Sequence, residues 1–388
     1  MQTSWWKDRK DLDEYQQALI MLPADGGHLF VGPPGCGKTN MLVLRARYLS
    51  GGGDSNVLFL TYGRTLSEFI KTGVISKKHL DADQVMTFSL WAYRTLRELA
   101  PDALDARPDF GALYANDHER YKAEREWFAE ALRKATENLP RNYFDAIFVD
   151  EVQDFTASEL EVLSRLTERL NVAGDSRQKI YGGNGLDAAR GMQLRESKLD
   201  YHYRIGPAIC TVADKVLTDE DTKPLIQTCR YNDKRLPSSA LAVPCETFAG
   251  QLEAMAANIR TQLKAFQDET IGIFLPTFKH GLLDDLMAFL AGTDFAELVG
   301  YHSEAEREFD AEKRIFVMTC HSSKGTEFRA VHILAAERFR FPLGSRTLVF
   351  TAVTRAKTSL RLYYTGQLSA YIKSAFAERT VVDFDSIF

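Results

Sequence analysis

The sequence predicts an α/β protein with two domains, each a parallel sheet flanked by helices. Short apolar runs that end in glycine or acidic residues alternate with helical stretches along the chain. One such run, at residues 28–31, leads through the loop GPPGCGKT into a helix expected at 39–49. The length of 388 residues also exceeds what one small core usually supports, so two domains are the natural expectation.

We expect the first domain to span residues 1–195, with a reduced helical insertion at about 92–142, and the second to span 196–388. Three turn-rich stretches are candidate joints: 100–110, 182–191 and 232–244. The second domain should repeat the architecture without a second phosphate loop. Its expected strands are 271–275, 314–319, 330–335 and 359–364, and its expected helices are 252–266, 281–291 and 367–377.

Composition favours a protein of a reducing compartment, and we expect a cytoplasmic one with no membrane partner. No apolar run is long enough to span a bilayer, and the start of the chain has no signal-peptide pattern. The five cysteines are scattered without a C-x-x-C pair, which argues against a zinc site or a disulfide framework. With a net charge of −5, any nucleic-acid contact should be a local groove and not a general positive field.

The loop after residue 31 matches G-x-x-x-x-G-K-[ST], the pattern that cradles phosphates. Its glycines, Gly32, Gly35 and Gly37, allow backbone N–H groups to turn toward phosphate oxygens. Lys38 would supply charge to the β and γ phosphates, and the Thr39 hydroxyl can be a ligand of Mg²⁺. ATP with Mg²⁺ is therefore the expected cofactor, although kinases, motors, switches and transporters all share this loop.

A second acidic cluster follows the apolar run at 144–149 in YFDAIFVDEVQDF. Asp150 fits the shell of the metal ion, and Glu151 fits the general base that activates water. In LNVAGDSRQKIYG, Gln178 lies just past a third strand end and could hydrogen-bond the γ-phosphate or the attacking water. Two arginines of the second half, Arg204 and Arg355, are candidates for stabilising the phosphoryl transition state.

In this order, the motifs resemble those of superfamily 1 helicases of the UvrD/Rep/PcrA type, nearly from end to end. The matching stretches are LDEYQQA, GPPGCGKT, VLFLTYGRTLSEF, VMTFSLW, IFVDEVQDF, VAGDSRQKIYG, LDYHYRIG, VMTCHSSKGTEFRAVHIL and LVFTAVTRAK. The resemblance implies two RecA-like domains, with ATP in the cleft between them and single-stranded DNA, or a junction of single and double strands, across their top.

The resemblance also implies roles for individual residues. Gln16 would contact the adenine edge and Tyr203 would stack on adenine, while Arg204 and Arg355 would be arginine fingers. Glu327 would hold the ribose, and Gly325 would form the turn beside it. The positions that touch single-stranded DNA in the family are Thr61, Tyr62, Thr87, His321 and Lys324. Core packing by Tyr62 and a structural role for His321 are the alternatives.

The sequence departs from the family in several respects, one of which is Ser89 at a position where members often have a histidine. The segment IYGGNGLDAA lacks the aromatic residue and arginine that usually follow IY, and the large accessory insertions are missing. The expected function is 3′–5′ movement along, or unwinding of, DNA driven by ATP. The alternative is a DNA-stimulated ATPase that activates or loads a partner, such as a nuclease or a replication or repair factor, with little unwinding. A small-molecule kinase would not explain the motifs after the phosphate loop.

Overall fold

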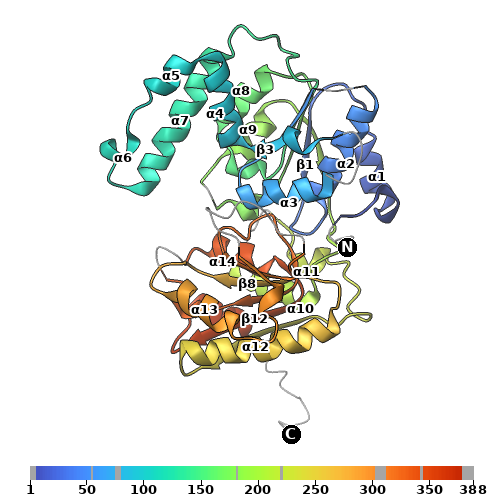
Figure 1. Ribbon diagram of the computed structural model, residues 1–388. Coiled ribbons are helices and arrows are strands. Elements are labelled where there is room, and N and C mark those ends of the chain that lie inside the picture. The colour runs from blue at the N-terminus through green and yellow to red at the C-terminus, as the bar shows by residue number, and fades with distance from the viewer. Residues whose placement is uncertain are drawn as a thin grey trace. The chain divides into compact units, whose positions relative to one another are not determined.

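The computed structural model describes residues 6–53, 56–74, 80–180, 182–218, 222–301, 312–340 and 344–377 (Figure 1). The chain forms two compact units that divide between His202 and Tyr203. Residues Lys324–Thr326 belong to the first unit, and the segments on either side of them belong to the second. No helix in these ranges combines the length and the apolar character that crossing a bilayer requires.

The first unit is built on a six-stranded sheet in the order β3-β2-β4-β5-β1-β6. Every pairing in it is parallel. The strands are β1 (His28–Val31), β2 (Val57–Thr61), β3 (Val85–Thr87), β4 (Ala146–Val149), β5 (Leu170–Gly174) and β6 (Arg195–Lys198). A parallel sheet needs helical cover on both faces, which explains why β2, β4 and β5 are buried along their whole length.

Successive side chains of each strand point to opposite faces, and the helices of the first unit divide accordingly. Leu60, Ile147 and Val149 pack in one core with helices α4 (Phe88–Leu99), α7 (Asp117–Ala135), α8 (Ala157–Arg165) and α9 (Gly185–Gly191). Phe59 directly precedes Leu60, Phe148 lies between Ile147 and Val149, and the two rings stack on each other. Helices α1 (Glu14–Ile20), α2 (Lys38–Gly51) and α3 (Arg64–Val74) also belong to this unit.

The range predicted for the helical insertion, about 92–142, contains most of α4 together with α5 (Pro101–Asp105), α6 (Phe110–Leu113) and α7. Figure 1 shows these helices beside α4, outside the sheet of the first unit. Helix α7 begins after Asn116, whose side chain accepts a hydrogen bond from the backbone of His118 at 2.8 Å. It is the longest helix of the insertion, and its inner face joins the core of the first unit through Ala129 and Leu132.

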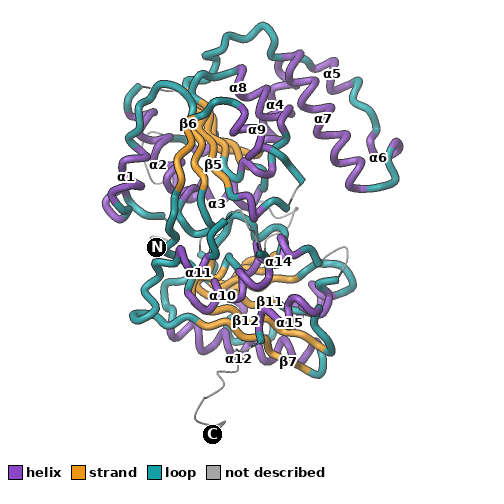
Figure 2. Tube along the Cα trace, turned by 180° about the vertical axis from the view of Figure 1, so that it is seen from behind, coloured by secondary structure: helices purple, strands orange, loops and turns teal. Residues whose placement is uncertain are grey.

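The second unit is built on a six-stranded parallel sheet in the order β7-β12-β11-β8-β10-β9 (Figure 2). Its strands are β7 (Ser239–Cys245), β8 (Ile271–Leu275), β9 (Val299–Tyr301), β10 (Ile315–Thr319), β11 (Phe328–Ile333) and β12 (Ala356–Thr365). Its helices are α10 (Pro207–Val216), α11 (Leu225–Thr228), α12 (Phe248–Ala265), α13 (Leu282–Ala291), α14 (Arg346–Val353) and α15 (Ala370–Phe376). Helices α12 and α13 form one core with β8 and β10.

The predicted parallel α/β architecture is confirmed, and most expected strands and helices lie within a few residues of their predicted bounds. The prediction of a joint at 232–244 is wrong over its second half. Residues Ser239–Cys245 form the edge strand β7, paired with β12. Proline lacks a backbone N–H and cannot donate to a neighbouring strand. An edge strand has a neighbour on one side only, so it tolerates Pro244.

Candidate functional site

The phosphate loop connects β1 to α2, as predicted. Gly35 and Gly37 have φ values of 79° and 87°, a left-handed conformation that favours glycine. Gly37 is also the N-cap of α2, so the positive end of this helix faces the loop. The ammonium of Lys38 is buried and donates to the carbonyl oxygens of Gly32 at 2.8 Å and Pro33 at 3.1 Å. The loop therefore has the backbone shape and the charge that a polyphosphate needs.

Gln16 connects the first helix to this loop. Its side-chain nitrogen donates to the carbonyl oxygen of Cys36 at 2.8 Å. Its oxygen accepts from the backbone of Asp13 at 3.2 Å, in a reciprocal cap at the start of α1. Gln16 is thus held beside the phosphate loop.

The two predicted acidic residues lie at the carboxyl end of β4. The Thr39 hydroxyl donates to Asp150 Oδ2 at 2.6 Å, so the predicted metal ligands from the loop and from the second motif meet. Both offer oxygen atoms, the ligand type that Mg²⁺ prefers, and their donor set fits this ion. Burial, together with the adjacent charge of Glu151, raises the pKa of Asp150 to about 7. A bound cation would oppose that effect by favouring the carboxylate.

Glu151 has a strained backbone, and Gln153 connects its side chain to the residue that follows the neighbouring strand β5. The φ of Glu151 is 54°, a left-handed value that is unusual for a side chain of this size. Gln153 donates from its side-chain nitrogen to Glu151 Oε2, and its oxygen accepts from the backbone of Asp175 at 3.1 Å. A Cβ on Gly174 would lie 2.6 Å from that oxygen, so the bridge requires glycine there.

Gln178 lies past the carboxyl end of β5, in the short turn Ser176–Gln178. It is buried, and its side-chain nitrogen donates to Asp175 Oδ2 at 3.3 Å. Arg177 Nε contacts the other oxygen of the same carboxylate at 3.4 Å. Strands β4, β5 and β1 are neighbours in the sheet, so the acidic motif, Gln178 and the phosphate loop share one edge of it.

In the second unit, two predicted residues, Arg204 and Glu327, form a charged cluster with a third residue, Lys357. Arg204 Nη1 pairs with Glu327 Oε2, and Lys357 Nζ pairs with Glu327 Oε1 at 2.7 Å. Glu327 directly precedes β11, and Lys357 is the second residue of β12, the strand beside it. The structure therefore brings Arg204 and Glu327 together, and adds Lys357.

The other predicted residues of the second unit do not take part in these two ion pairs. Arg355 is almost fully buried, and it donates from Nε to the carbonyl oxygen of Thr351 at 2.9 Å and from Nη2 to Thr354 Oγ1 at 3.3 Å. Tyr203 is 44% exposed. Gly325 has φ of 81°, as a tight turn requires.

Two family models match the chain. A model described as an AAA domain matches residues 16–184, and a model described as the UvrD-like helicase C-terminal domain matches residues 314–363. The first match contains the phosphate loop and the acidic motif, and the second contains Lys324, Glu327 and Arg355. The chain is a UvrD-like helicase of superfamily 1. It is accordingly an ATP-hydrolysing enzyme of a family that binds nucleic acid.

Two similar solved structures share low sequence identity with this helicase. The C-terminal domain of a possible DNA helicase from Lactobacillus plantarum WCFS1 is 19% identical, with a TM-score of 0.32, over 44% of this chain and 91% of that one. The PRRSV helicase is 11% identical, with a TM-score of 0.40, and the match covers 89% of this chain and 54% of that one. A search of curated proteins gave no match.

Three of the positions predicted to touch DNA lie at the same sheet edge as the candidate ATP site. Thr61 ends β2, and its hydroxyl donates to the carbonyl oxygen of Gly63 at 3.0 Å. Thr87 ends β3 and caps α4 by accepting from Leu90 N at 3.3 Å. Tyr62 follows β2. Because β3 and β2 continue the row formed by β4, β5 and β1, the helicase places both candidate sites along one edge.

Of the last two candidates for DNA contact, His321 is partly buried and Lys324 is buried. Burial lowers the pKa of His321, which favours the neutral imidazole. Lys324 is buried and pairs with Asp154 Oδ2, and its ammonium lies 3.7 Å from Glu151 Oε2. Lys324 therefore touches the acidic motif of the helicase.

Sequence reasoning missed Gln153, Lys357 and Arg125. Gln153 is part of the motif that contains Glu151, but nothing in its spacing distinguishes it from the other polar residues there. Lys357 follows the predicted arginine finger by two positions, a signal that could have drawn attention to it. Arg125 lies in the insertion, and its nearest partner, Glu159, is far away in the sequence.

Proposed function

We propose that this helicase uses ATP and Mg²⁺ to move along single-stranded DNA in the 3′–5′ direction. The observation that carries the proposal is the meeting of Thr39 with Asp150, beside a Glu151 that Gln153 holds in place. A nucleotide-binding module without turnover would need no oriented general base. The direction and the preference for DNA rest on the family resemblance.

In the proposed reaction, each residue has one task. The phosphate loop and Lys38 hold the β and γ phosphates, while Glu151 accepts the proton of the attacking water. Thr39 and Asp150 would hold Mg²⁺, which supplies positive charge to the phosphate oxygens when it is bound. Gln178 would orient the water or report the presence of the γ-phosphate.

Two arginines of the second unit have a proposed role in the same reaction. We propose that Arg204 and Arg355 stabilise charge on the transferring phosphoryl group. Arg204 is paired with Glu327 in the described unit, so it would exchange that carboxylate for phosphate oxygens. Such an exchange would couple ATP binding to rearrangement of the cluster, and hence to an alternating grip on the strand.

The first experiment is ATP turnover with and without single-stranded DNA. The expected result is strong stimulation by single strands and little by duplex, with Lys38→Ala as the inactive blank. Glu151→Gln should abolish turnover but keep ATP binding, whereas Glu161→Gln, an exposed glutamate of α8, should leave both unchanged. Rapid turnover without any effect of DNA would contradict the proposal.

Direction is tested separately, by displacement of streptavidin from DNA that carries biotin at one end. Movement in the 3′–5′ direction should clear the protein from the 5′ end only. A second candidate function is activation of a protein partner, favoured by the small insertion of the first unit and by the GGNG segment. It predicts DNA-stimulated turnover without strand separation on a duplex that has a 3′ single-stranded tail.

A further inference from the structure

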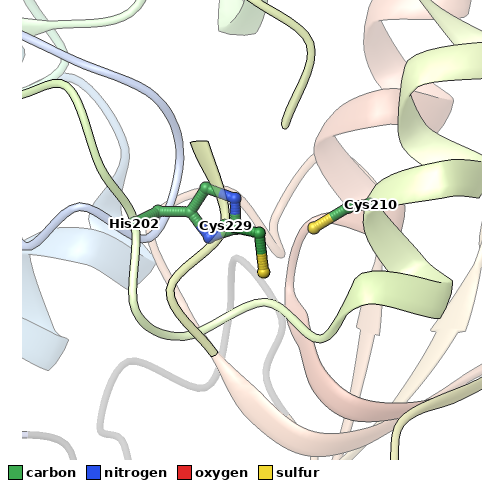
Figure 3. Close-up of side chains that lie close together, drawn as sticks. All are labelled: His202, Cys210 and Cys229. Carbon is green, nitrogen blue, oxygen red and sulfur yellow. The ribbon is translucent and has the colours of Figure 1, made fainter. Parts of the chain in front are cut away.

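We propose that Cys210 and Cys229 form a disulfide when the protein meets a peroxide, and that this bond lowers ATP turnover through Arg204. Both cysteines are free thiols, and they belong to the second unit, as Arg204 does. Their Sγ atoms lie within 4.8 Å of each other. Figure 3 shows the Cys210 side chain extending from helix α10 toward Cys229. The scattered spacing of the cysteines in the sequence gives no sign of this pair, because the fold brings it together.

The two thiols converge on one acceptor. Cys210 Sγ lies 3.4 Å from the carbonyl oxygen of Ile205, and Cys229 Sγ lies 3.3 Å from the same oxygen. A disulfide requires the two sulfur atoms to approach to about 2.05 Å. Rotation about the Cα–Cβ bond of a cysteine moves its sulfur by about 3 Å from one rotamer to the next. Rotation of these side chains can therefore close the remaining distance.

The environments of the two thiols give them different roles. Donation by the Cys210 thiol, opposed in part by burial, lowers the pKa of Cys229 to about 7, so a large share of Cys229 is thiolate near neutral pH. The same hydrogen bond, together with burial, raises the pKa of Cys210. Cys229 is partly exposed, whereas Cys210 is buried. Cys229 is therefore the thiol that reacts with the oxidant, and Cys210 is the thiol that closes the disulfide.

The proposed reaction consumes one hydrogen peroxide for each disulfide. The Cys229 thiolate attacks one peroxide oxygen, the O–O bond breaks, and the products are a sulfenic acid on Cys229 and hydroxide, which takes up a proton to become water. The Cys210 sulfur then attacks the sulfenic sulfur. The S–S bond forms, the S–O bond breaks, and the Cys210 proton leaves with the hydroxyl group as a second water. Two electrons pass from the sulfur pair to the peroxide oxygens, and a thiol reductant returns them.

The disulfide would act on Arg204 through Ile205, the next residue in the chain. A disulfide has no S–H group, so oxidation withdraws both thiols as donors to the carbonyl oxygen of a fully buried residue. Loss of donors to a buried acceptor costs free energy, which favours displacement of Ile205. Gly206 limits movement on the other side, because its backbone N–H donates to the carbonyl oxygen of Lys357 at 2.8 Å. The displacement therefore reaches Arg204 and its pair with Glu327. This effect on turnover rests on the proposed role of Arg204, whereas the disulfide itself does not.

The first test detects the disulfide and needs no ATP turnover. The unaltered chain is reduced, freed of reductant and treated with a small molar excess of hydrogen peroxide. Peptide mapping by mass spectrometry without reduction should find Cys210 linked to Cys229. Maleimide labelling of Cys229 should fall by about tenfold and return after dithiothreitol. Cys245 is the internal control and should keep its labelling, because it is partly buried and burial raises its pKa. Absence of the linked pair, or a Cys229 that is oxidised beyond the sulfenic acid without it, would overturn the inference.

The second test compares ATP turnover of the oxidised and the reduced chain on single-stranded DNA. Oxidation should lower kcat by about tenfold, and dithiothreitol should restore it. In Cys229→Ser, the serine hydroxyl keeps a donor for Ile205, so this variant should have ordinary turnover and should resist peroxide. Cys245→Ser is the matched control and should lose turnover on oxidation as the unaltered chain does.

The outcomes separate the disulfide from the proposed function. A linked pair in a chain that has no turnover even when reduced would contradict the proposed function and support the disulfide. Full turnover of the oxidised chain would overturn control by this pair. Equal loss of turnover in Cys229→Ser would overturn it as well, and would direct attention to Cys36 in the phosphate loop.

Discussion

The guanidinium of Arg125 lies over the ring of Tyr62, 4.6 Å from its centroid. The same guanidinium donates from Nε and Nη2 to the carboxylate of Glu159, at 2.9 and 2.6 Å, and from Nη2 to the carbonyl oxygen of Asp154 at 2.7 Å. Phe155 contacts the ring of Tyr62 edge-on at 5.7 Å. A helix of the small insertion therefore holds a residue that the family resemblance assigns to DNA, and it also contacts the acidic motif.

Arg125→Met should destabilise the first unit by about 3–5 kcal/mol, because it leaves the carboxylate of Glu159 buried without its charged partner. Urea unfolding followed by circular dichroism measures this change. Arg133→Met is the matched control on the same helix: its pair with Glu130 is exposed, and its loss should cost less than about 1 kcal/mol. The double variant Arg125→Met/Glu159→Gln should recover much of the loss. Equal effects of the two single variants would contradict a stabilising role of the buried ion pair between Arg125 and Glu159.

The contact of Arg125 with the ring of Tyr62 also predicts a change in DNA binding. If Tyr62 stacks on a base, Arg125→Met should weaken single-stranded DNA binding at temperatures where the variant remains folded, because it frees the ring from its fixed orientation. Tyr62→Ala should remove about 1–3 kcal/mol of binding free energy. Fluorescence anisotropy of a labelled oligonucleotide tests both variants. Unchanged affinity in Tyr62→Ala would assign this tyrosine to the core alone.

Gln153→Ala should lower kcat for ATP by about 10- to 100-fold, equivalent to about 1.4–2.8 kcal/mol, and leave KM for ATP nearly unchanged. The reason is that Gln153 touches Glu151 and the end of β5, and so positions the proposed base without reaching the nucleotide. Gly174→Ala should have the same effect, because its methyl group would occupy the place of the Gln153 oxygen. Steady-state turnover with saturating single-stranded DNA measures both constants. A rise in KM with kcat preserved would mean that Gln153 serves ATP binding instead.

The phosphate loop and Asp150 could be predicted from the sequence because their signals are local. A strand, a glycine spacing and a following helix determine the loop within a dozen residues, and an acidic pair after a buried strand is recognisable in the same way. Edge strand β6 could not be found, because its residues, Arg195–Lys198, are polar and carry no apolar alternation. Strand β6 forms because it pairs with β1, and the sequence does not show which strands pair.

Pairings between distant segments were equally beyond prediction. Glu327 meets Lys357 because β11 and β12 are adjacent, and the strand order follows from tertiary packing. Arg125 reaches Glu159 because helices α7 and α8 pack side by side. Sequence spacing predicts which residues have suitable chemistry, but only the fold determines which of them become neighbours.

Thr39→Val should raise the Mg²⁺ concentration needed for half-maximal ATP turnover by about tenfold, corresponding to the loss of one ligand worth about 1.4 kcal/mol. Valine has the same branched shape as threonine, so the variant should keep its fold. Asp150, the partner of the Thr39 hydroxyl, remains as one of the two proposed ligands. Thr261→Val, on the exposed face of α12, is the control. An unchanged Mg²⁺ requirement in Thr39→Val would exclude this hydroxyl from the metal site.

His332 predicts a loss of stability in mild acid. Its ring is fully buried, with Nδ1 at 3.0 Å from the Tyr363 hydroxyl and Nε2 at 2.7 Å from Gln262 Oε1. Burial, with a smaller effect of the Arg361 charge, lowers its pKa from 6.5 to about 3. Above pH 6.5 the imidazole is neutral in both the folded and the unfolded chain, so it causes no pH dependence there. Below that pH, only the unfolded chain takes up the proton.

The stability contributed by a neutral His332 should therefore fall by about 1.4 kcal/mol for each pH unit below 6.5, which gives about 2.7 kcal/mol at pH 4.5. Urea unfolding between pH 7.5 and 4.5 should show a smaller decline in His332→Gln than in the unaltered chain, by about this amount. The variant should also be less stable at pH 7.5, because Tyr363 and Gln262 lose well-placed hydrogen bonds. His118→Gln, at an exposed position of α7, should follow the unaltered chain at every pH. Parallel curves for His332→Gln and the unaltered chain would show that this imidazole takes up its proton in the folded state.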